Sequence, residues 1–232
     1  MSYGREEIYQ RQLALIGKDG LAALGSSKVA VCGLGGVGSY VVEALARSGV
    51  GELLLIDFDK VSVSNINRQL CALHSTVGRD KADVIAERVA DIDPACGVRI
   101  ARVFLDEDTD MDALFAGCSY IADAIDHIPA KVKMICWAKE NGIPVISAMG
   151  AGRRLDPGAL KVADISKTEG CPLARNMRRL LRQQGIESGV DVVFSTEHPL
   201  PVEPGQLGSI AFVPSVAGLL MASVIVRNIV KK

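Results

Sequence analysis

From residue 28 to residue 150, apolar and polar positions follow one another in an order that predicts strands alternating with helices. Five apolar runs have the length and composition of buried strands: residues 28–32, 52–56, 98–103, 119–126 and 143–147. Apolar positions at helical spacing lie between them: residues 41–46, 81–92, 110–116 and 128–141. Strands that alternate with helices build a parallel sheet with helices on both faces. The pattern therefore predicts an α/β fold with a Rossmann-like, doubly wound, mainly parallel sheet.

The flanking segments predict further helices. Residues 5–25 contain one or two short helices, because Gly17-Lys-Asp-Gly20 interrupts their apolar pattern. Residues 210–227 are strongly apolar, yet they are too short for a membrane span and contain Pro214 and Arg227. We expect no integral membrane span here but a helix packed on the sheet or at a dimer interface, with peripheral membrane contact left open.

Composition sets limits on the class of protein. Apolar residues make up 49% and charged residues 23% of the 232 positions, as in globular proteins, and the net charge of −1 neither indicates nor excludes a nucleic-acid partner. A chain of this length can form one large domain. We predict a single domain over 1–232, with a core at 1–150 and a C-terminal extension at 151–232.

Cysteine usage bears on the cellular compartment. Six cysteines are scattered along the chain, and none belongs to a C-x-x-C pair. This usage fits a reducing compartment better than a disulfide framework, and it gives no sign of structural zinc. The polar start, Met1 to Glu7, lacks the apolar core of a signal peptide. We therefore expect a cytoplasmic protein.

A glycine cluster follows the first predicted strand: Gly33, Gly35, Gly36 and Gly38. In a strand–turn–helix unit the first glycine permits the tight turn, the second lets phosphates approach the backbone, and the third lets the helix pack on the strand. The helix N-terminus adds free N–H groups and a positive dipole end. The cluster predicts that the core at 1–150 binds the phosphates of a nucleotide.

Carboxylates follow two of the predicted strands at the same edge of the sheet. Asp57 and Asp59 follow the second strand, and Asp57 lies 19 positions after Gly38, a spacing that suits hydrogen bonds from a ribose diol. Asp126 ends the strand predicted at 119–126. Because Mg²⁺ bridging phosphates takes one or two carboxylates, Asp126 is a candidate metal ligand, with a helix N-cap as the alternative.

The loop after these aspartates is dense in polar groups, with Asn65, Arg68 and Gln69, and Lys81 opens the next predicted helix. Arg68 presents a planar fork suited to phosphate oxygens, and Asn65 and Gln69 can orient carbonyls or phosphates. A lysine in a first helical turn opposes the helix dipole, so we expect an anion beside Lys81. Arg68 and Lys81 predict a polyphosphate clamp, and together with Asp126 they disfavour an NAD-dependent oxidoreductase.

In chain order, these motifs are Gly33-x-Gly-Gly-x-Gly38, Asp57-x-Asp59, Ser64-Asn65-x-x-Arg68-Gln69, Lys81 and Asp126. Over residues 8–150 they resemble the adenylating superfamily of the ThiF, MoeB and ubiquitin-activating enzymes. The resemblance implies an ATP site in which the glycine turn, Arg68 and Lys81 bind phosphates, Asp57 binds the ribose and Asp126 binds Mg²⁺. It also implies a homodimer in which Arg11, within a Tyr-x-Arg-Gln motif, reaches the partner's active site. The implied catalytic residues are Arg11, Arg68, Lys81 and Asp126.

The second half resembles one branch of this superfamily, the tRNA threonylcarbamoyladenosine dehydratases. The similar segments are Gly150-Ala-Gly152, Leu155-Asp-Pro157, 162–168, Cys171-Pro-Leu-Ala174 and 189–197. The resemblance implies ligase-type activation by ATP of the threonylcarbamoyl carboxylate at tRNA adenosine 37, followed by ring closure with loss of water. Residues 151–232 would then face the tRNA and pack the dimer. Sulfur-carrier adenylyltransferases typically hold zinc with two C-x-x-C pairs, which this chain lacks.

A tRNA substrate requires a basic surface, and residues 172–183 supply one if they are helical. Four arginines recur on one face of that helix: Arg175, Arg178, Arg179 and Arg182. Three more basic residues precede them: Arg153, Arg154 and Lys167. We expect these seven side chains to contact the phosphate backbone, with an ordinary solvated arginine face as the alternative.

Two other functions stay open at this point. One is an adenylyltransferase for a sulfur-carrier or ubiquitin-like protein, which a diglycine-ending partner and dependence on Cys171 would mark. The other is a non-catalytic partner that binds a nucleotide and turns nothing over. Dehydration itself needs no thiol, so Cys171 has no assigned role. The sequence also leaves open the release of AMP or ADP, a sulfur-transfer partner and a bound monovalent cation.

Overall fold

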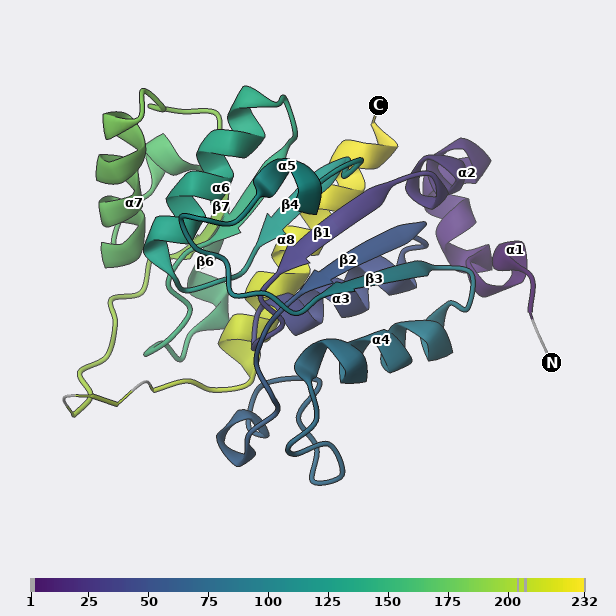
Figure 1. The fold of residues 1–232 in the computed structure, drawn as a ribbon, viewed down its shortest axis with the longest axis horizontal. Helices are drawn as coiled ribbons and strands as arrows, with labels where there is room; N and C mark the ends of the chain where they lie inside the picture. The colour runs from purple at the N-terminus through teal and green to yellow at the C-terminus, as the bar shows by residue number, and fades with distance from the viewer. Residues whose placement is uncertain (1–2, 204, 207, 232) are drawn as a thin grey trace.

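A seven-stranded sheet forms the centre of the molecule (Figure 1). The computed structural model describes residues 3–203, 205–206 and 208–231. The strand order is β3-β2-β1-β4-β5-β7-β6. The strands are β1 (Lys28–Cys32), β2 (Glu52–Ile56), β3 (Gly97–Ala101), β4 (Tyr120–Asp123), β5 (Val145–Ala148), β6 (Leu160–Asp164) and β7 (Asp191–Ser195). Neighbouring strands are parallel except β6 and β7, which confirms the predicted mainly parallel α/β sheet.

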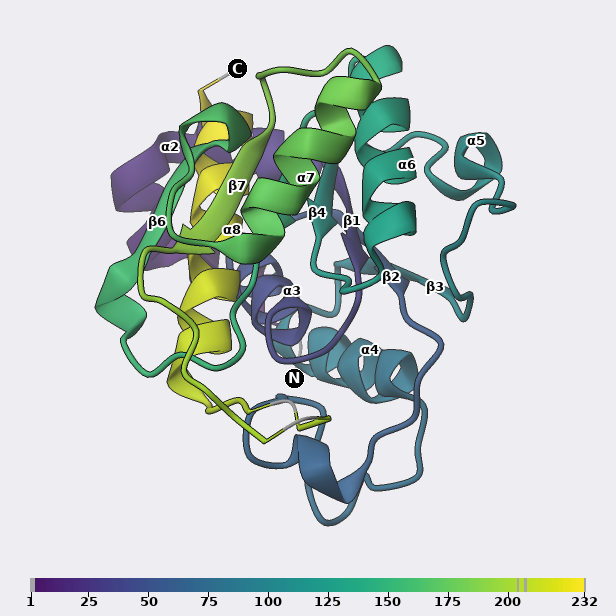
Figure 2. The same ribbon diagram turned by 90° about the vertical axis from the view of Figure 1, so that its left-hand side faces the viewer.

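Helices cover both faces of this sheet, as Figure 2 shows. They are α1 (Arg5–Ile8), α2 (Gln10–Gly25), α3 (Gly38–Arg47), α4 (Lys81–Ile92), α5 (Met111–Leu114), α6 (Ile128–Glu140), α7 (Pro172–Gln183) and α8 (Phe212–Val230). Helices α2, α3, α4 and α8 share one apolar core, and α5, α6 and α7 share the other. Strand β1 feeds both cores, because Val29 and Val31 face the first while Ala30 and Cys32 face the second.

The connections reverse direction between β1 and β4. Strand β1 pairs with β2 on one side and with β4 on the other. In such sheets the loops after the two central strands diverge, which opens a crevice at the carboxyl edge. The glycine turn after β1 and the segment 124–126 after β4 both lie at this crevice. The sheet topology therefore places the predicted nucleotide residues at a common edge.

Helix α8 is the helix packed on the sheet that residues 210–227 predict, although the argument used against a membrane span does not hold. It runs through Pro214 and Arg227 without a break and is 19 residues long, so the argument that this segment is too short and interrupted was wrong. A proline in the first helical turn costs no intrahelical hydrogen bond. The helix is long enough to cross a bilayer, and its mean hydropathy of 1.8 is high enough. Half of its most apolar stretch, however, is buried inside the protein. A core helix of a globular protein has the same two properties.

Other differences concern element boundaries and two strands. Strands β6 and β7 were not predicted, and the strand expected at 119–126 ends at Asp123. The break expected near Gly17 is present, since that residue has φ 68° and ψ 179° inside α2. Residues 198–203, 205–206 and 208–210 form a loop without helix or strand, and Pro204 and Leu207 lie outside the described residues.

Candidate active site

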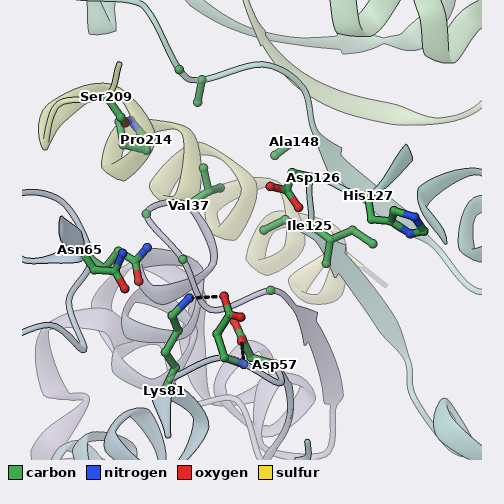
Figure 3. A pocket seen from close by; sticks show the side chains of 18 of the residues that line it. Val37, Asp57, Asn65, Lys81, Ile125, Asp126, His127, Ala148, Ser209 and Pro214 are labelled. Carbon is green, nitrogen blue, oxygen red and sulfur yellow. Dashed lines mark hydrogen bonds and ion pairs between the residues drawn. The ribbon is translucent and has the colours of Figure 1, made fainter. Parts of the chain in front are cut away.

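The crevice at the carboxyl edge contains a cavity of about 480 Å³, a size typical of small-molecule sites. Figure 3 shows Asp57 and Lys81 on one side of the cavity and Asp126 across from them. Of the ten residues predicted to bind the nucleotide, nine line this cavity, as does Asp126: Gly33, Gly35, Gly36, Asp57, Asp59, Asn65, Arg68, Gln69 and Lys81. The tenth, Gly38, begins helix α3 immediately behind the turn.

The glycine turn has the backbone shape that the sequence predicts. Gly33 has φ +84°, a left-handed conformation that favours glycine. A Cβ at Gly38 would overlap the carbonyl oxygen of Gly33, so the third glycine permits close packing of the helix on the strand. A Cβ at Gly35 would meet only Gln69 Nε2, at 3.7 Å, and so this position faces the cavity. The start of α3 carries no side-chain capping hydrogen bond, but the Ser39 and Tyr40 amides already donate to the Gly35 and Val37 carbonyl oxygens, so the helix offers a ligand its remaining amides and the positive end of its dipole.

Asp57 is the buried carboxylate of the site. Its Oδ2 accepts a hydrogen bond from the Leu34 amide at 2.6 Å, and its Oδ1 accepts one from the Asp59 amide at 2.8 Å. Burial raises the pKa of Asp57, although these two amide hydrogen bonds oppose the shift. Each carboxylate oxygen keeps a further lone pair, so both oxygens can also accept hydrogen bonds from a ribose diol.

Lys81 is buried and its ammonium lies 2.7 Å from Asp59 Oδ2. It is the first residue of α4, where a positive charge opposes the helix dipole. The anion expected beside Lys81 is therefore present in the protein itself, as Asp59. Because Asp59 is about half exposed, this ion pair is open to the cavity and can exchange partners when an anion enters.

The loop between Asp59 and α4 holds its polar side chains in place. Asn65 Oδ1 accepts a hydrogen bond from the Ser62 amide at 3.1 Å. Arg68 Nη1 donates to the Ser64 carbonyl oxygen at 2.9 Å and to Asn67 Oδ1 at 2.8 Å. These bonds fix a guanidinium and an amide at the rim of the cavity, where both were expected.

Asp126 is exposed and lies beyond the end of β4. The N-cap of α6 is His127, so the alternative role of Asp126 as a helix cap is wrong. Within the described part of the chain, no three histidine, cysteine or carboxylate side chains converge as a metal cluster. A single free carboxylate facing the cavity suits Mg²⁺, which takes most of its other ligands from phosphate and water.

An apolar wall of the cavity was not anticipated from the sequence. Phe58, Val103, Phe104 and Ile125 line it, with His127 beside them. The Phe104 ring centroid lies 5.0 Å from those of both Phe58 and His127. Such a surface offers a flat apolar face to a nucleobase. The exposed run Val103-Phe104 just beyond β3 is the signal in the sequence that could have indicated it.

A buried ion pair lies beneath the cavity floor and was also missed. Lys131 and Asp123 are both fully buried, with Nζ 2.9 Å from Oδ2. Lys131 also donates to the carbonyl oxygens of Ile125 and Ala148, and Ser147 Oγ donates to Asp123 at 2.5 Å. The group ties the ends of β4 and β5 together under the segments that line the cavity. A lysine among the apolar positions of 128–138 was the available signal.

Arg11 does not reach this cavity. It is exposed on α2, next to Gln12, whose side-chain amide donates to the Ser48 carbonyl oxygen at the C-terminal end of α3. Helix α3 starts at the glycine turn and has 10 residues, so its two ends are about 15 Å apart. Within one chain, Arg11 and the nucleotide residues therefore lie at opposite ends of α3.

Comparison with known proteins agrees with this arrangement. The sequence profile described as the ThiF family matches residues 9–232. The chain belongs to the ThiF family. It is 43% identical to a tRNA threonylcarbamoyladenosine dehydratase of Bacillus subtilis, over 96% of this chain and 94% of that protein. The Escherichia coli enzyme of the same name, solved in complex with ATP, superposes with a TM-score of 0.92 at 36% identity, over 99% of this chain and 96% of that one.

The ThiF family also contains enzymes of another activity. A molybdopterin-synthase adenylyltransferase of Salmonella typhimurium is 35% identical over 78% of this chain and 73% of that protein. Similarity to the Bacillus subtilis dehydratase extends over more of the chain and at higher identity. The basic residues expected to contact tRNA lie in the second half of this ThiF-family chain.

Helix α7 of this ThiF-family protein is amphipathic as predicted, with Met177 and Leu181 buried. Five of the seven basic residues are exposed: Arg153, Lys167, Arg175, Arg179 and Arg182. Arg178 is half-buried and donates to the Thr168 carbonyl oxygen at 2.6 Å. Arg154 is buried, with 4% of its surface exposed, so the expectation that it contacts a tRNA backbone was wrong. Charge spacing along a sequence does not reveal which arginine turns inward.

Proposed function

We propose that this ThiF-family protein is an ATP-dependent tRNA threonylcarbamoyladenosine dehydratase. The observation that carries the proposal is the 43% identity to a dehydratase over nearly the full length of both chains. It is supported by a cavity lined by a glycine turn, Arg68 and Lys81, as a triphosphate requires. The substrate is a tRNA carrying threonylcarbamoyladenosine, and the product is its cyclic form. A cytoplasmic location accords with six free cysteines.

The reaction couples carboxylate activation to ring closure. An oxygen of the threonylcarbamoyl carboxylate attacks the α-phosphorus of ATP, the bond between the α-phosphorus and the bridging oxygen breaks, and pyrophosphate leaves. A nitrogen or oxygen of the same substituent then attacks the acyl carbon, loses its proton to solvent and expels AMP. The protein positions the two reactants and neutralises phosphate charge, which is sufficient for this type of transfer.

Each residue of the cavity has a task in this scheme. Asp57 accepts hydrogen bonds from the ribose, and the amides after Gly33 receive phosphate oxygens. Lys81 leaves Asp59 for the phosphates, and Arg68 supplies N–H groups at the rim. Asp126 is the ligand that would hold Mg²⁺, which when bound neutralises charge on the phosphates.

A homodimer completes the proposed active site. Arg11 is exposed and points away from its own cavity, as expected for a residue that serves the partner subunit. Leu15, on the same helix, is 86% exposed and would give a partner subunit an apolar side chain to pack against. The exposed basic residues of α7, Arg175, Arg179 and Arg182, would receive the tRNA phosphates.

The deciding experiment incubates the purified protein with ATP, Mg²⁺ and tRNA that carries threonylcarbamoyladenosine, then digests the tRNA and weighs its nucleosides. We expect that nucleoside to lose the mass of one water, with AMP and pyrophosphate formed in equal amount. An unchanged nucleoside mass, beside an active control enzyme, would refute the proposal. Formation of ADP instead of AMP would refute attack at the α-phosphorus, but it would not refute the dehydratase proposal.

Adenylyltransferase activity is the second candidate function, because a relative with that activity is 35% identical to this chain. It predicts exchange of labelled pyrophosphate into ATP that depends on a small protein ending in two glycines. It also predicts loss of activity in a Cys171→Ala variant, whereas the dehydratase proposal expects that variant to keep its activity.

A further inference from the structure

Arg154 is a buried cation with an unused hydrogen-bond donor. Its Nε donates to the Glu197 carbonyl oxygen at 3.2 Å and its Nη1 to the Gly152 carbonyl oxygen at 2.9 Å. Among the described residues, no atom accepts a hydrogen bond from its Nη2, and no carboxylate lies within ion-pair distance of its guanidinium. A buried charge without a counter-ion is costly, so the arrangement suits an anion that comes from outside the chain.

The guanidinium lines a second cavity, of about 220 Å³, beside the nucleotide cavity. Gly150, Cys171 and Pro199 contribute to its walls. A Cβ at Gly150 would lie 3.2 Å from Arg154 Nη1 and 3.6 Å from Nη2, so the guanidinium is packed against a backbone position that has no side chain. The two cavities share Gly150, Gly152 and Leu173 as lining residues. A group held by Arg154 is therefore next to the nucleotide.

The N-terminus of α7 opens onto the same cavity. The helix begins at Pro172, and its N-cap, Cys171, makes no side-chain capping hydrogen bond. Pro172 has no N–H and the Arg175 amide donates to the Cys171 carbonyl oxygen, so this end of the helix offers the Leu173 and Ala174 amides and the positive end of its dipole. The charge on Arg154, its unused Nη2 donor and this helix end all favour an anion small enough for the cavity.

We propose that this second cavity binds the carboxylate of the substrate, with Arg154 as its principal ligand. The inference rests on the proposed function, in which a carboxylate must be held beside ATP. Arg154 binds one carboxylate oxygen through Nη2, and the other oxygen faces the nucleotide cavity across Gly150. Arg154 thus recognises the threonylcarbamoyl group itself, and the exposed arginines of α7 serve the tRNA backbone. A guanidinium suits this task because its planar fork of N–H donors matches the geometry of a carboxylate.

The test compares an anticodon stem-loop RNA carrying threonylcarbamoyladenosine with its carboxyl methyl ester, which removes the negative charge and adds one methyl group. Binding to the whole enzyme is measured in the presence of a non-hydrolysable ATP analogue. We expect wild-type protein to prefer the acid by roughly 10- to 100-fold, the effect of one charged hydrogen-bonding partner. In Arg154→Gln the preference should fall close to one, and Arg154→Lys should restore part of it.

The matched control is Arg47→Gln, which removes an exposed guanidinium at the far end of α3 and should leave the preference unchanged. An unaltered preference in folded Arg154→Gln would overturn the proposal, as would equal binding of acid and ester by wild-type protein. If Arg154→Gln does not fold, Gly150→Ala provides a second test, since its methyl group would crowd Nη1 and should reduce the preference. Dehydration by wild-type protein with no effect of either variant refutes this inference alone, whereas absence of dehydration refutes the proposed function.

Discussion

Gly33 and Gly38 approach each other so closely across the turn that no side chain fits at residue 38. A Cβ there would overlap the Gly33 carbonyl oxygen, whereas a Cβ at Gly35 would meet only the end of the Gln69 side chain. Gly38 and Gly35 therefore serve different purposes. Gly38 is required by the fold, and Gly35 is required by the ligand alone. A pair of alanine substitutions separates these roles.

We expect Gly38→Ala to lower the free energy of unfolding by about 1–3 kcal/mol, the usual cost of overpacking, and to weaken ATP binding by at least about tenfold. Gly35→Ala should change stability by less than about 1 kcal/mol, since its φ suits alanine, yet weaken ATP binding similarly. Chemical denaturation and calorimetric titration with ATP measure the two effects. Equal losses of stability in both variants would contradict this division.

The same scale shows why parts of the site could not be predicted. Asp57 was predictable from its spacing to the glycine turn, and Arg68 and Lys81 from a loop dense in polar groups and from a lysine at the start of a helix. Arg154 was assigned to the surface because nothing in a run of basic residues indicates that Arg153 adopts φ 59° and that the next side chain turns inward. Lys131 was missed because its burial depends on an ion pair with Asp123 of the preceding strand, which the spacing of apolar positions does not reveal.

At the scale of elements, an ionic link joins helices α3 and α4. Glu43 on α3 accepts hydrogen bonds from Arg88 of α4 at 2.6 Å and 2.9 Å, and from Arg47 at 2.8 Å. Burial alone would raise the pKa of Glu43, but the hydrogen bonds from Arg88 and Arg47 outweigh it, and the pKa lies below its ordinary value. The carboxylate therefore stays ionised in the folded state at a pH where it is protonated in the unfolded chain.

This difference fixes the sign of a pH effect. The stabilisation by Glu43 is present above its unfolded pKa, about 4.3, and is lost as the pH falls through the lower folded value. We expect Glu43→Gln to lower the free energy of unfolding by about 1 kcal/mol at pH 7, and its difference from wild type to shrink towards zero at low pH. Urea unfolding between pH 7 and pH 3 measures this, with Glu187→Gln, at an exposed carboxylate, as the control. A difference that grows on acidification would contradict it.

Elements whose residues are buried on both sides were predicted well, because they carry continuous apolar runs. Strand β6 lies at the edge of the sheet and is half exposed, so its sequence lacks such a run. Strand β7 contributes only the short run Val192 to Phe194. Helix α8 was judged too short because Pro214 was taken as a break, although a proline is compatible with a first helical turn.

At the scale of the whole molecule, the opposite placement of Arg11 and the nucleotide cavity leads to a test of shared active sites. On the proposed homodimer, we expect purified Arg11→Ala and purified Lys81→Ala each to be inactive. In co-expressed equal mixture, heterodimers contain one site with both wild-type residues, so activity should return to roughly a quarter of wild type. Dehydration of the tRNA nucleoside measures it.

A matched mixture identifies the cause of any recovery. Arg11→Ala combined with the double variant Arg11→Ala, Lys81→Ala contains no intact site and should stay inactive. If the first mixture shows no more activity than its components, Arg11 does not act across an interface. If Arg11→Ala alone keeps full activity, the arginine has no part in the reaction.

Helix α8 packs on parts of the chain that the ribosome makes much earlier. Its Gly218 packs on the backbone of Val37, and its Pro214 lies against the glycine turn, with side-chain carbons 3.2 Å and 3.3 Å from where a Cβ of Gly36 would be. The ribosome therefore completes every strand of the sheet before it makes the helix that closes the first core. Until α8 is made, the nascent chain exposes the apolar side of α3 and lacks Pro214, which lines the nucleotide cavity, so we expect ATP to stabilise the chain only after α8 has packed.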